Sequence, residues 1–225
     1  MIKRGLKPKG KVKIKWSANF AYAIGLIATD GCLYKDGRHI NLTSKDREQI
    51  KNFQKSLGIN LNIGRKSNGY NKVKKYYVVQ IGDVKFYEFL ISIGITPAKS
   101  KTLGQVTVPK EYFFDFLRGV LDGDGYVHSY FDPRWRSSFL WYLGFCSASL
   151  EFLSWIRSEL RIRLRIEGHI TMSKRSSCMQ LKYAKTEAAI LVKYLYCNKK
   201  SLYLSRKRLK IKKILAIVDE LRGSN

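Results

Sequence analysis

Two aspartates occupy matching places in two similar segments of this 225-residue sequence. The first segment, residues 23–31, reads AIGLIATDG, and the second, residues 117–125, reads LRGVLDGDG. In both segments an aspartate follows a glycine by five residues and directly precedes another glycine, so Asp30 corresponds to Asp124. Each segment is apolar enough for a buried helix, and the Asp-Gly pair falls at the point where a helix would end. The sequence therefore predicts two carboxylates, each at the C-terminus of a helix.

A carboxylate at a helix C-terminus is unfavourable, because the helix dipole is negative there. Two such ends brought together would repel one another further. A divalent cation between the aspartates would offset the repulsion, and Mg²⁺ prefers hard oxygen ligands of this kind. Exposed carbonyl groups at the helix ends, those of Thr29 and Gly123, are further candidate ligands.

Glycines inside the two expected helices indicate how the ends could meet. Gly25 and Gly119 are at interior positions, where glycine costs about 1 kcal/mol relative to alanine. With Thr29 and Gly123 four residues further on, each forms a stripe of small residues that lets two helix backbones approach closely. A single Asp-Gly pair could equally be an ordinary turn at a helix stop. Two copies in matching register favour a shared site.

The elements around the two segments occur in the same order twice. In each half we expect a helix, two strands, a second helix, two more strands and a third helix. The expected ranges are 17–30, 32–34, 39–43, 46–57, 60–64, 75–81 and 83–94 in the first half, and 113–124, 126–131, 139–146, 149–160, 164–171, 178–183 and 186–196 in the second, followed by a basic helix at 203–221.

This repeat predicts an α+β fold with two pseudo-symmetric αββαββα subdomains. We place the first subdomain at residues 16–105 and the second at residues 106–225. Residues 1–15 contain seven basic residues and no acid, and we expect them to form a flexible basic arm.

The charge balance indicates a polyanionic partner. The chain has 43 Lys and Arg against 17 Asp and Glu, a formal net charge of +26, which self-repulsion disfavours unless a polyanion relieves it. Nucleic acid is therefore the expected partner rather than a membrane. The four cysteines form no Cys-x-x-Cys pair, so neither zinc nor disulfides are expected. No secretory signal or long apolar run is present, and we expect a soluble intracellular protein.

The two motif segments resemble those of LAGLIDADG homing endonucleases in their single-chain, two-motif form. The likeness covers residues 16–221 because the intervening elements match as well. It implies that the motif helices pack at a central interface and that each half adds a curved antiparallel sheet which binds in the DNA major groove. Ala28, Thr29 and Arg118 depart from the motif consensus. None of them is at the position of the catalytic acid.

The resemblance implies a site-specific double-stranded DNA endonuclease, with the intron or intein mobility typical of the family. Asp30 and Asp124 would bind Mg²⁺ near the two scissile phosphates, with Mn²⁺ as a substitute and Ca²⁺ supporting binding without cleavage. The protein would act as a monomer with no obligate protein partner. Family sites also carry peripheral polar and basic residues, for which the matching positions are Ser44, Ser147, Lys99 or Lys101, and Lys207 or Arg206.

Alternation along the strands gives one face for the core and one for DNA, with asymmetric contacts over a target of roughly 20 bp. The block 199–213 has eight basic residues and is expected to flank the DNA. We expect DNA contacts from Tyr34, Lys35, Arg38, Asn41, Thr43, Arg65, Lys66, Asn68, Tyr70, Lys72, Lys74, Tyr76 and Gln80 in the first half, and from His128, Tyr130, Arg134, Trp135, Arg136, Ser138, Tyr142, His169, Thr171, Lys174, Arg175, Ser177 and Gln180 in the second.

An alternative function is a non-catalytic DNA- or RNA-binding protein, a maturase or regulator, on the same scaffold. Such proteins often lose one or both motif acids, whereas this sequence retains Asp30 and Asp124. A generic RNA-binding protein would explain the charge but not the two matched motifs.

Overall fold

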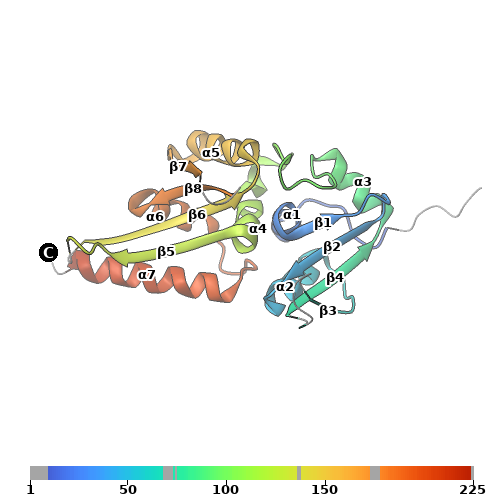
Figure 1. Cartoon of the computed structure of the whole chain (residues 1–225), viewed down its shortest axis with the longest axis horizontal. Helices are drawn as coiled ribbons and strands as arrows, with labels where there is room; N and C mark the ends of the chain where they lie inside the picture. Colours follow the sequence, from blue (N-terminus) through green and yellow to red (C-terminus); the bar gives the residue numbers. More distant parts are fainter. Residues whose placement is uncertain (1–9, 68–72, 74, 136–137, 173–177, 224–225) are drawn as a thin grey trace, which may run out of the picture.

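The computed structural model describes residues 10–67, 73, 75–135, 138–172 and 178–223. Two halves lie side by side along the long axis of the molecule, and helices α1 and α4 meet between them (Figure 1). The first half contains α1 (Ala18–Asp30), β1 (Gly31–Leu33), β2 (His39–Ser44), α2 (Arg47–Leu57), β3 (Gly64–Lys66), β4 (Tyr76–Gly82) and α3 (Val84–Ser92). The second contains η1 (Lys110–Tyr112), α4 (Phe113–Asp124), β5 (Gly125–Phe131), β6 (Phe139–Ser147), α5 (Leu150–Leu164), β7 (His169–Met172), β8 (Met179–Ala184), α6 (Lys185–Leu195) and α7 (Ser205–Gly223).

Each half builds one four-stranded antiparallel sheet with the same topology. The strand order is β1-β2-β4-β3 in the first sheet and β5-β6-β8-β7 in the second. The first strand of each sheet starts directly after the motif helix, at Gly31 or at Gly125, and both glycines are in extended conformation. The predicted α+β architecture with two repeated halves is confirmed.

The hydrophobic core lies between the sheets and the helices. The apolar residues of β2 and β6 stand at alternate positions and are buried, Ile40 and Leu42 in β2 and Phe139, Trp141, Leu143 and Phe145 in β6, so one face of each sheet packs against helices and the other faces outward. Ser17 caps α1 by accepting a hydrogen bond from the Phe20 amide. Asp83 does the same for α3 through the Phe86 amide.

The first residues of the described chain are anchored, and the prediction of a flexible arm is wrong for them. The Val12 side chain is buried in the core. The amides of Lys11 and Val12 both donate to one carboxylate oxygen of Asp83, whose other oxygen caps α3. Residues 1–9 of the predicted arm are outside the described residues.

Two predicted strands begin later than expected. Residues 59–63 return beside α2, where the Leu61 amide donates to the Gln54 side chain, and the strand starts only at Gly64. In the second half α5 continues to Leu164, supported by an ion pair between Arg163 and Glu159 one turn apart. Arg165 then ends the helix in the left-handed conformation, so β7 starts at His169 rather than at residue 164.

Candidate active site between the motif helices

The two motif helices approach closely at their glycines. A β-carbon on Gly25 would lie 2.1 Å from the Phe116 carbonyl oxygen, and one on Gly119 would lie 2.2 Å from the Tyr22 carbonyl oxygen. One turn further, a β-carbon on Gly123 would lie 2.0 Å from the hydroxyl of Thr29. At Gly25 and Gly119 no side chain larger than a hydrogen atom fits without moving a backbone, and at Gly123 a side chain would collide with that of Thr29, which explains the costly glycines inside both helices.

This packing brings the C-terminal ends of α1 and α4 together, and with them Asp30 and Asp124. The position of a β-carbon on Gly123 lies only 3.3 Å from Oδ2 of Asp30. Burial, followed by the charge of Asp124, raises the pKa of Asp30 to about 6. Burial also raises the pKa of Asp124. The two carboxylates therefore carry an electrostatic cost in the folded chain that a cation could relieve.

Gln49 is a site residue that the sequence did not reveal. Its side-chain nitrogen donates to Oδ2 of Asp30 at 2.5 Å, and its oxygen accepts a hydrogen bond from the Ser44 hydroxyl at 3.1 Å. Gln49 is on the buried face of α2, between core positions, where a polar residue requires a partner. That unusual placement was the available signal. Ser44 thus acts on Asp30 through Gln49.

The described residues of the second half form no hydrogen-bond series equivalent to Ser44–Gln49–Asp30. Ser44 ends β2 and Ser147 ends β6, while Gln49 and Phe152 are each the third residue of the following helix. Phe152 is a core residue and cannot donate to a carboxylate. Ser147 accepts a hydrogen bond from the Ser149 amide and lines the space beside Asp124. The two aspartates are therefore held differently.

Lys99 and Lys207 lie at the ends of the two motif helices. The Lys99 ammonium donates to the Gly31 carbonyl oxygen. The Lys207 ammonium donates to four backbone oxygens at the end of α4, those of Leu121, Asp122, Gly123 and Gly125. Burial lowers the pKa of Lys99, and lowers that of Lys207 to about 8, although the nearby aspartates oppose both shifts. Both lysines are buried and place a positive charge next to the site.

Lys207, predicted as a basic neighbour of the site, is thus also a helix cap. The alternative residue, Arg206, forms an ion pair with Asp46 at 2.8 Å. The Gly123 carbonyl already accepts a hydrogen bond from Lys207, so a role as a metal ligand would use its second lone pair.

A buried network fixes α4 against the segment that leads into α7. The Asp122 carboxylate accepts hydrogen bonds from the Tyr22 hydroxyl at 2.8 Å and from the Leu204 amide at 2.7 Å. Arg118, fully buried, donates to the carbonyl oxygens of Leu195 and Leu202. The Tyr22–Asp122 bond joins the two halves, and the other bonds hold the segment before α7 against α4. Asp122 and Arg118, which replace the Ala28 and Ile24 of α1, thus anchor this segment to the motif helices.

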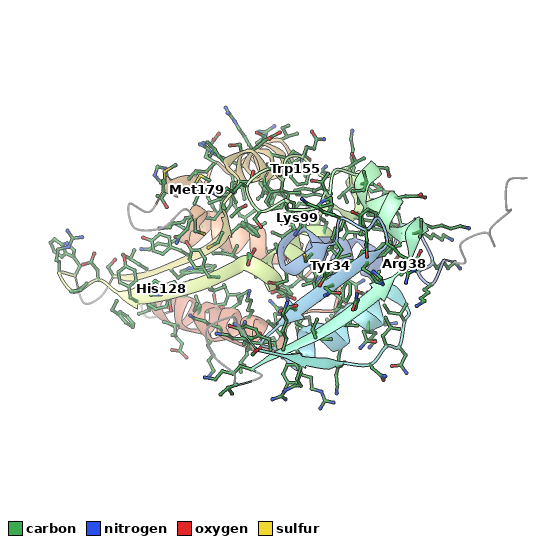
Figure 2. All side chains as sticks on the ribbon, turned by 45° about the vertical axis from the view of Figure 1, so that its right-hand side comes forward. Tyr34, Arg38, Lys99, His128, Trp155 and Met179 are labelled. Atoms are coloured by element: carbon green, nitrogen blue, oxygen red, sulfur yellow. The ribbon has the colours of Figure 1, made fainter. Side chains whose placement is uncertain are left out.

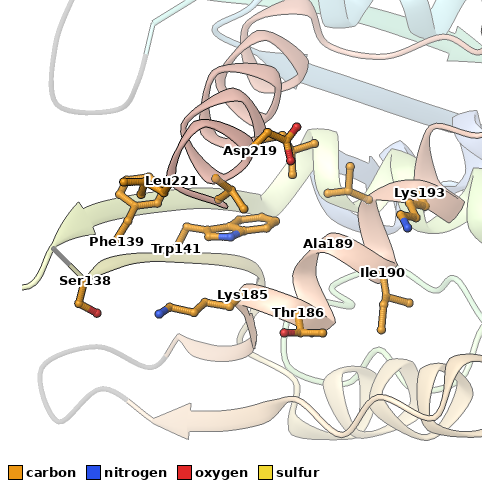
Figure 3. Close-up of a pocket in the computed structure, with 13 residues that line it drawn as sticks. Ser138, Phe139, Trp141, Lys185, Thr186, Ala189, Ile190, Lys193, Asp219 and Leu221 are labelled. Carbon is orange, nitrogen blue, oxygen red and sulfur yellow. The ribbon is translucent and has the colours of Figure 1, made fainter. Parts of the chain in front are cut away.

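A cavity of 240 Å³ opens beside Asp124. Lys99, Ser147, Cys146 and Cys178 contribute to its wall together with Thr29. Burial raises the pKa of Cys146 to about 12, so this thiol is protonated at neutral pH and is not a nucleophile. A larger cavity of 820 Å³ lies elsewhere, between β6, α6 and α7 and against Trp141 (Figure 3).

The residues around the aspartates suit a divalent cation whose remaining ligands come from water or from a bound phosphate group. The two carboxylates and the adjoining carbonyl groups are hard oxygen donors, as Mg²⁺ and Mn²⁺ prefer. Within the described ranges no three His, Cys, Asp or Glu side chains gather closely enough to bind a metal. A full ligand sphere would therefore need oxygens from water or from a bound phosphate group.

The outward faces of the two sheets hold most of the described residues that we expect to contact DNA. Figure 2 shows Tyr34 and Arg38 on the first half and His128 on β5 of the second. By strand register and burial, the outward set is Thr43, Lys66, Tyr76 and Gln80 on the first sheet and His128, Tyr130, Tyr142, His169, Thr171 and Gln180 on the second. Lys35, Arg38, Arg134 and Trp135 are exposed in the turns at the outer ends.

Other members of the predicted set are placed differently. Arg65 pairs in register with Tyr77 and packs on its ring at 4.7 Å, on the face that carries the core. Asn41 is buried and donates to the Tyr34 hydroxyl. Arg134 is paired with Asp132, and Ser138 lines the cavity between β6, α6 and α7. Outside the described residues are Asn68, Tyr70, Lys72, Lys74, Arg136, Lys174, Arg175 and Ser177.

The fold and the paired helix ends define a class of protein. Residues 17–94 match the family model of the LAGLIDADG-like domain. This segment comprises α1 to α3, including the first motif helix. The predicted resemblance is thus confirmed for residues 17–94, and the second half repeats the topology of the first. Among curated proteins none matches the sequence significantly.

Solved structures extend the likeness to the whole fold. The LAGLIDADG homing endonuclease I-GzeII in complex with its DNA target is 12% identical, with a TM-score of 0.60 over 91% of this chain and 92% of that one. Full-length DUF199/WhiA from Thermatoga maritima is 16% identical, with a TM-score of 0.55 over 91% of this chain and 62% of that one. A variant of I-DmoI with target DNA in the presence of Mn is 16% identical, with a TM-score of 0.50 over 79% of this chain and 92% of that one.

At these identities the likeness shows the fold alone. Homing endonucleases and WhiA share this fold, so the fold does not by itself establish nuclease activity. Among the described residues no helix is both long and apolar enough to cross a membrane.

Proposed function

We propose that this protein is a site-specific endonuclease that hydrolyses one phosphodiester in each strand of a long, asymmetric double-stranded DNA target. The observation that carries the proposal is the meeting of Asp30 and Asp124 at the ends of two glycine-packed helices. Two neighbouring carboxylates with raised pKa values are costly for stability, and among the described residues neither forms a hydrogen bond across the interface. Both acids are present in one chain, so a monomer suffices.

In this proposal the outward faces of the two sheets bind the major groove of successive half-sites, and the helix ends lie against the backbone between them. Asp30 and Asp124 hold Mg²⁺ or Mn²⁺, and the I-DmoI variant solved with DNA in the presence of Mn agrees with this choice. The chemistry that such a cation supplies is activation of water and neutralisation of charge on the leaving oxygen. Gln49 orients Asp30, while Lys99 and Lys207 add positive charge near the phosphates.

The test is incubation of the purified chain with a plasmid library of randomised inserts in Mg²⁺ and, separately, in Mn²⁺. We expect double-strand breaks at one related set of sequences of roughly 20 bp, an extent set by one helical turn per half. The WhiA likeness supports a second candidate, a DNA-binding protein without nuclease activity. Sequence-specific binding with no cleavage in either metal would establish that candidate instead.

A further inference from the structure

A hollow of 570 Å³ opens on the outward face of the second sheet, over β5, β6 and β8. This is the face that the proposed function lays in the major groove, so the inference below rests on that function. The outward side chains that line the hollow are Tyr126, His128, Tyr130, Tyr142, Gln180 and Lys182.

Three aromatic rings form one wall of the hollow. The rings of Tyr130 and Tyr142 lie nearly parallel, 6.4 Å apart between centroids and 22° between planes, and His128 lies 5.5 Å from Tyr130. In the major groove the only apolar group that a base edge offers is the C5-methyl of thymine. The wall is complementary to that group.

The polar side of the hollow offers mainly hydrogen-bond donors. The Tyr126 hydroxyl donates to Oε1 of Gln180 at 3.0 Å, which engages the amide oxygen and leaves both amide hydrogens available. The Lys182 ammonium is a donor only, and no partner for it occurs within the part of the chain that the structure describes. A bidentate contact with adenine would have to use the second lone pair of this amide oxygen, and it would leave the aromatic wall without an apolar partner.

We propose that this hollow is a thymine-reading subsite. The aromatic wall takes the C5-methyl group, and Gln180 or Lys182 donates to the O4 oxygen. Adenine and cytosine each present an amino donor at this edge, which would face donors of the protein. Guanine presents acceptors but no methyl group. Thymine is the base that satisfies both walls.

The first experiment removes the methyl group alone. The full chain is bound in Ca²⁺ to the site selected from randomised DNA, and each thymine of the half-site bound by the second sheet is replaced in turn by deoxyuridine. We expect about a fourfold loss of affinity at the thymine in the hollow, the value of one buried methyl group. In the Tyr142→Ala variant, which lacks part of the wall, the same replacement should cost nothing further.

The second experiment inverts the polar wall. Gln180→Glu keeps an oxygen for the Tyr126 hydroxyl and offers a second oxygen as an acceptor, so the selected base at this position should change from thymine to cytosine. The matched control is Gln80→Glu on the outward face of β4, which should alter preference only in the other half-site.

Specific binding with no deoxyuridine effect in this half-site, or an effect that persists unchanged in Tyr142→Ala, would overturn the thymine subsite and leave the proposed function standing. Absence of any sequence-specific binding to DNA would instead overturn the proposed function, and the subsite with it.

Discussion

Gln49 donates a hydrogen bond to Asp30, whereas Phe152, the equivalent residue of the second half, leaves Asp124 without such a donor. The two carboxylates are therefore equivalent in sequence and different in environment. Burial dominates the raised pKa of both, but the charge of Asp124 adds to the shift only at Asp30, where Gln49 acts against it. If each acid serves one strand, the strands should respond differently to changes around the site.

Replacing Gln49 by alanine tests this asymmetry. Hydrogen bonds to charged groups contribute about 1.5–3 kcal/mol, so we expect roughly a tenfold or larger slowing of the strand served by Asp30. Cleavage of the other strand should change little, and nicked DNA should accumulate. Time courses on a target labelled on each strand measure both rates. Equal slowing of the two strands in Gln49→Ala would contradict the assignment.

The glycines of α1 and α4 set the distance between the helices that carry the aspartates. In Gly25→Ala the new methyl group would overlap the Phe116 carbonyl, so the free energy of unfolding should fall by about 1–3 kcal/mol. Gly10→Ala is the control, because its β-carbon meets nothing nearer than 3.6 Å. Urea denaturation of both variants measures the difference. An unchanged urea midpoint for Gly25→Ala would show that the helix interface can accommodate a methyl group.

The cap on α4 can be tested in the same way. Lys207→Met removes the donor shared by four carbonyl oxygens and should cost about 1–3 kcal/mol of stability, because the buried oxygens lose their partner. Lys210→Met, at an exposed position of the same helix, is the matched control and should be nearly neutral. Equal effects of the two variants on the urea midpoint would argue that Lys207 acts only through its charge.

Local patterns in the sequence were enough to locate the elements. The range of α4 was predicted without error because its apolar run, its glycines and its Asp-Gly end all agree. Residues 59–63 were wrongly predicted as a strand because the Leu61 amide binds the Gln54 side chain instead. The end of α5 was placed too early because the residue that ends the helix in the left-handed conformation is Arg165. Gln49 was missed because its partner, Asp30, is on another helix. Lys207 was found by family position, but its contacts with α4 come from residues more than 80 positions away.

At the scale of the whole molecule, the net charge of +26 should govern affinity for DNA. Each phosphate that a Lys or Arg neutralises releases counterions. If six or more phosphates are contacted, affinity should fall by about 1,000-fold or more when salt rises from about 50 to 200 mM. Titrations of the selected target at several salt concentrations give the slope. A flat response would contradict binding through a basic surface.

The joined halves are a further property of the whole chain. Arg206 and Ser205 at the start of α7 bind Asp46 and Glu48 at the start of α2, and the Asn52 side chain donates to the Tyr203 carbonyl. The second half is thereby tied to the first outside the motif helices. This link holds the two sheets in a fixed relation, as the proposed recognition of one continuous target would require.

In the proposed function both Asp30 and Asp124 are required for cleavage of the two DNA strands. The most direct measurement compares Asp30→Asn, Asp124→Asn and the wild-type chain on the selected target, with cleavage assayed in Mg²⁺ and binding in Ca²⁺. We predict that neither variant makes a double-strand break and that both bind the target nearly as tightly as the wild-type chain does. Double-strand cleavage at the wild-type rate by either variant would contradict the account.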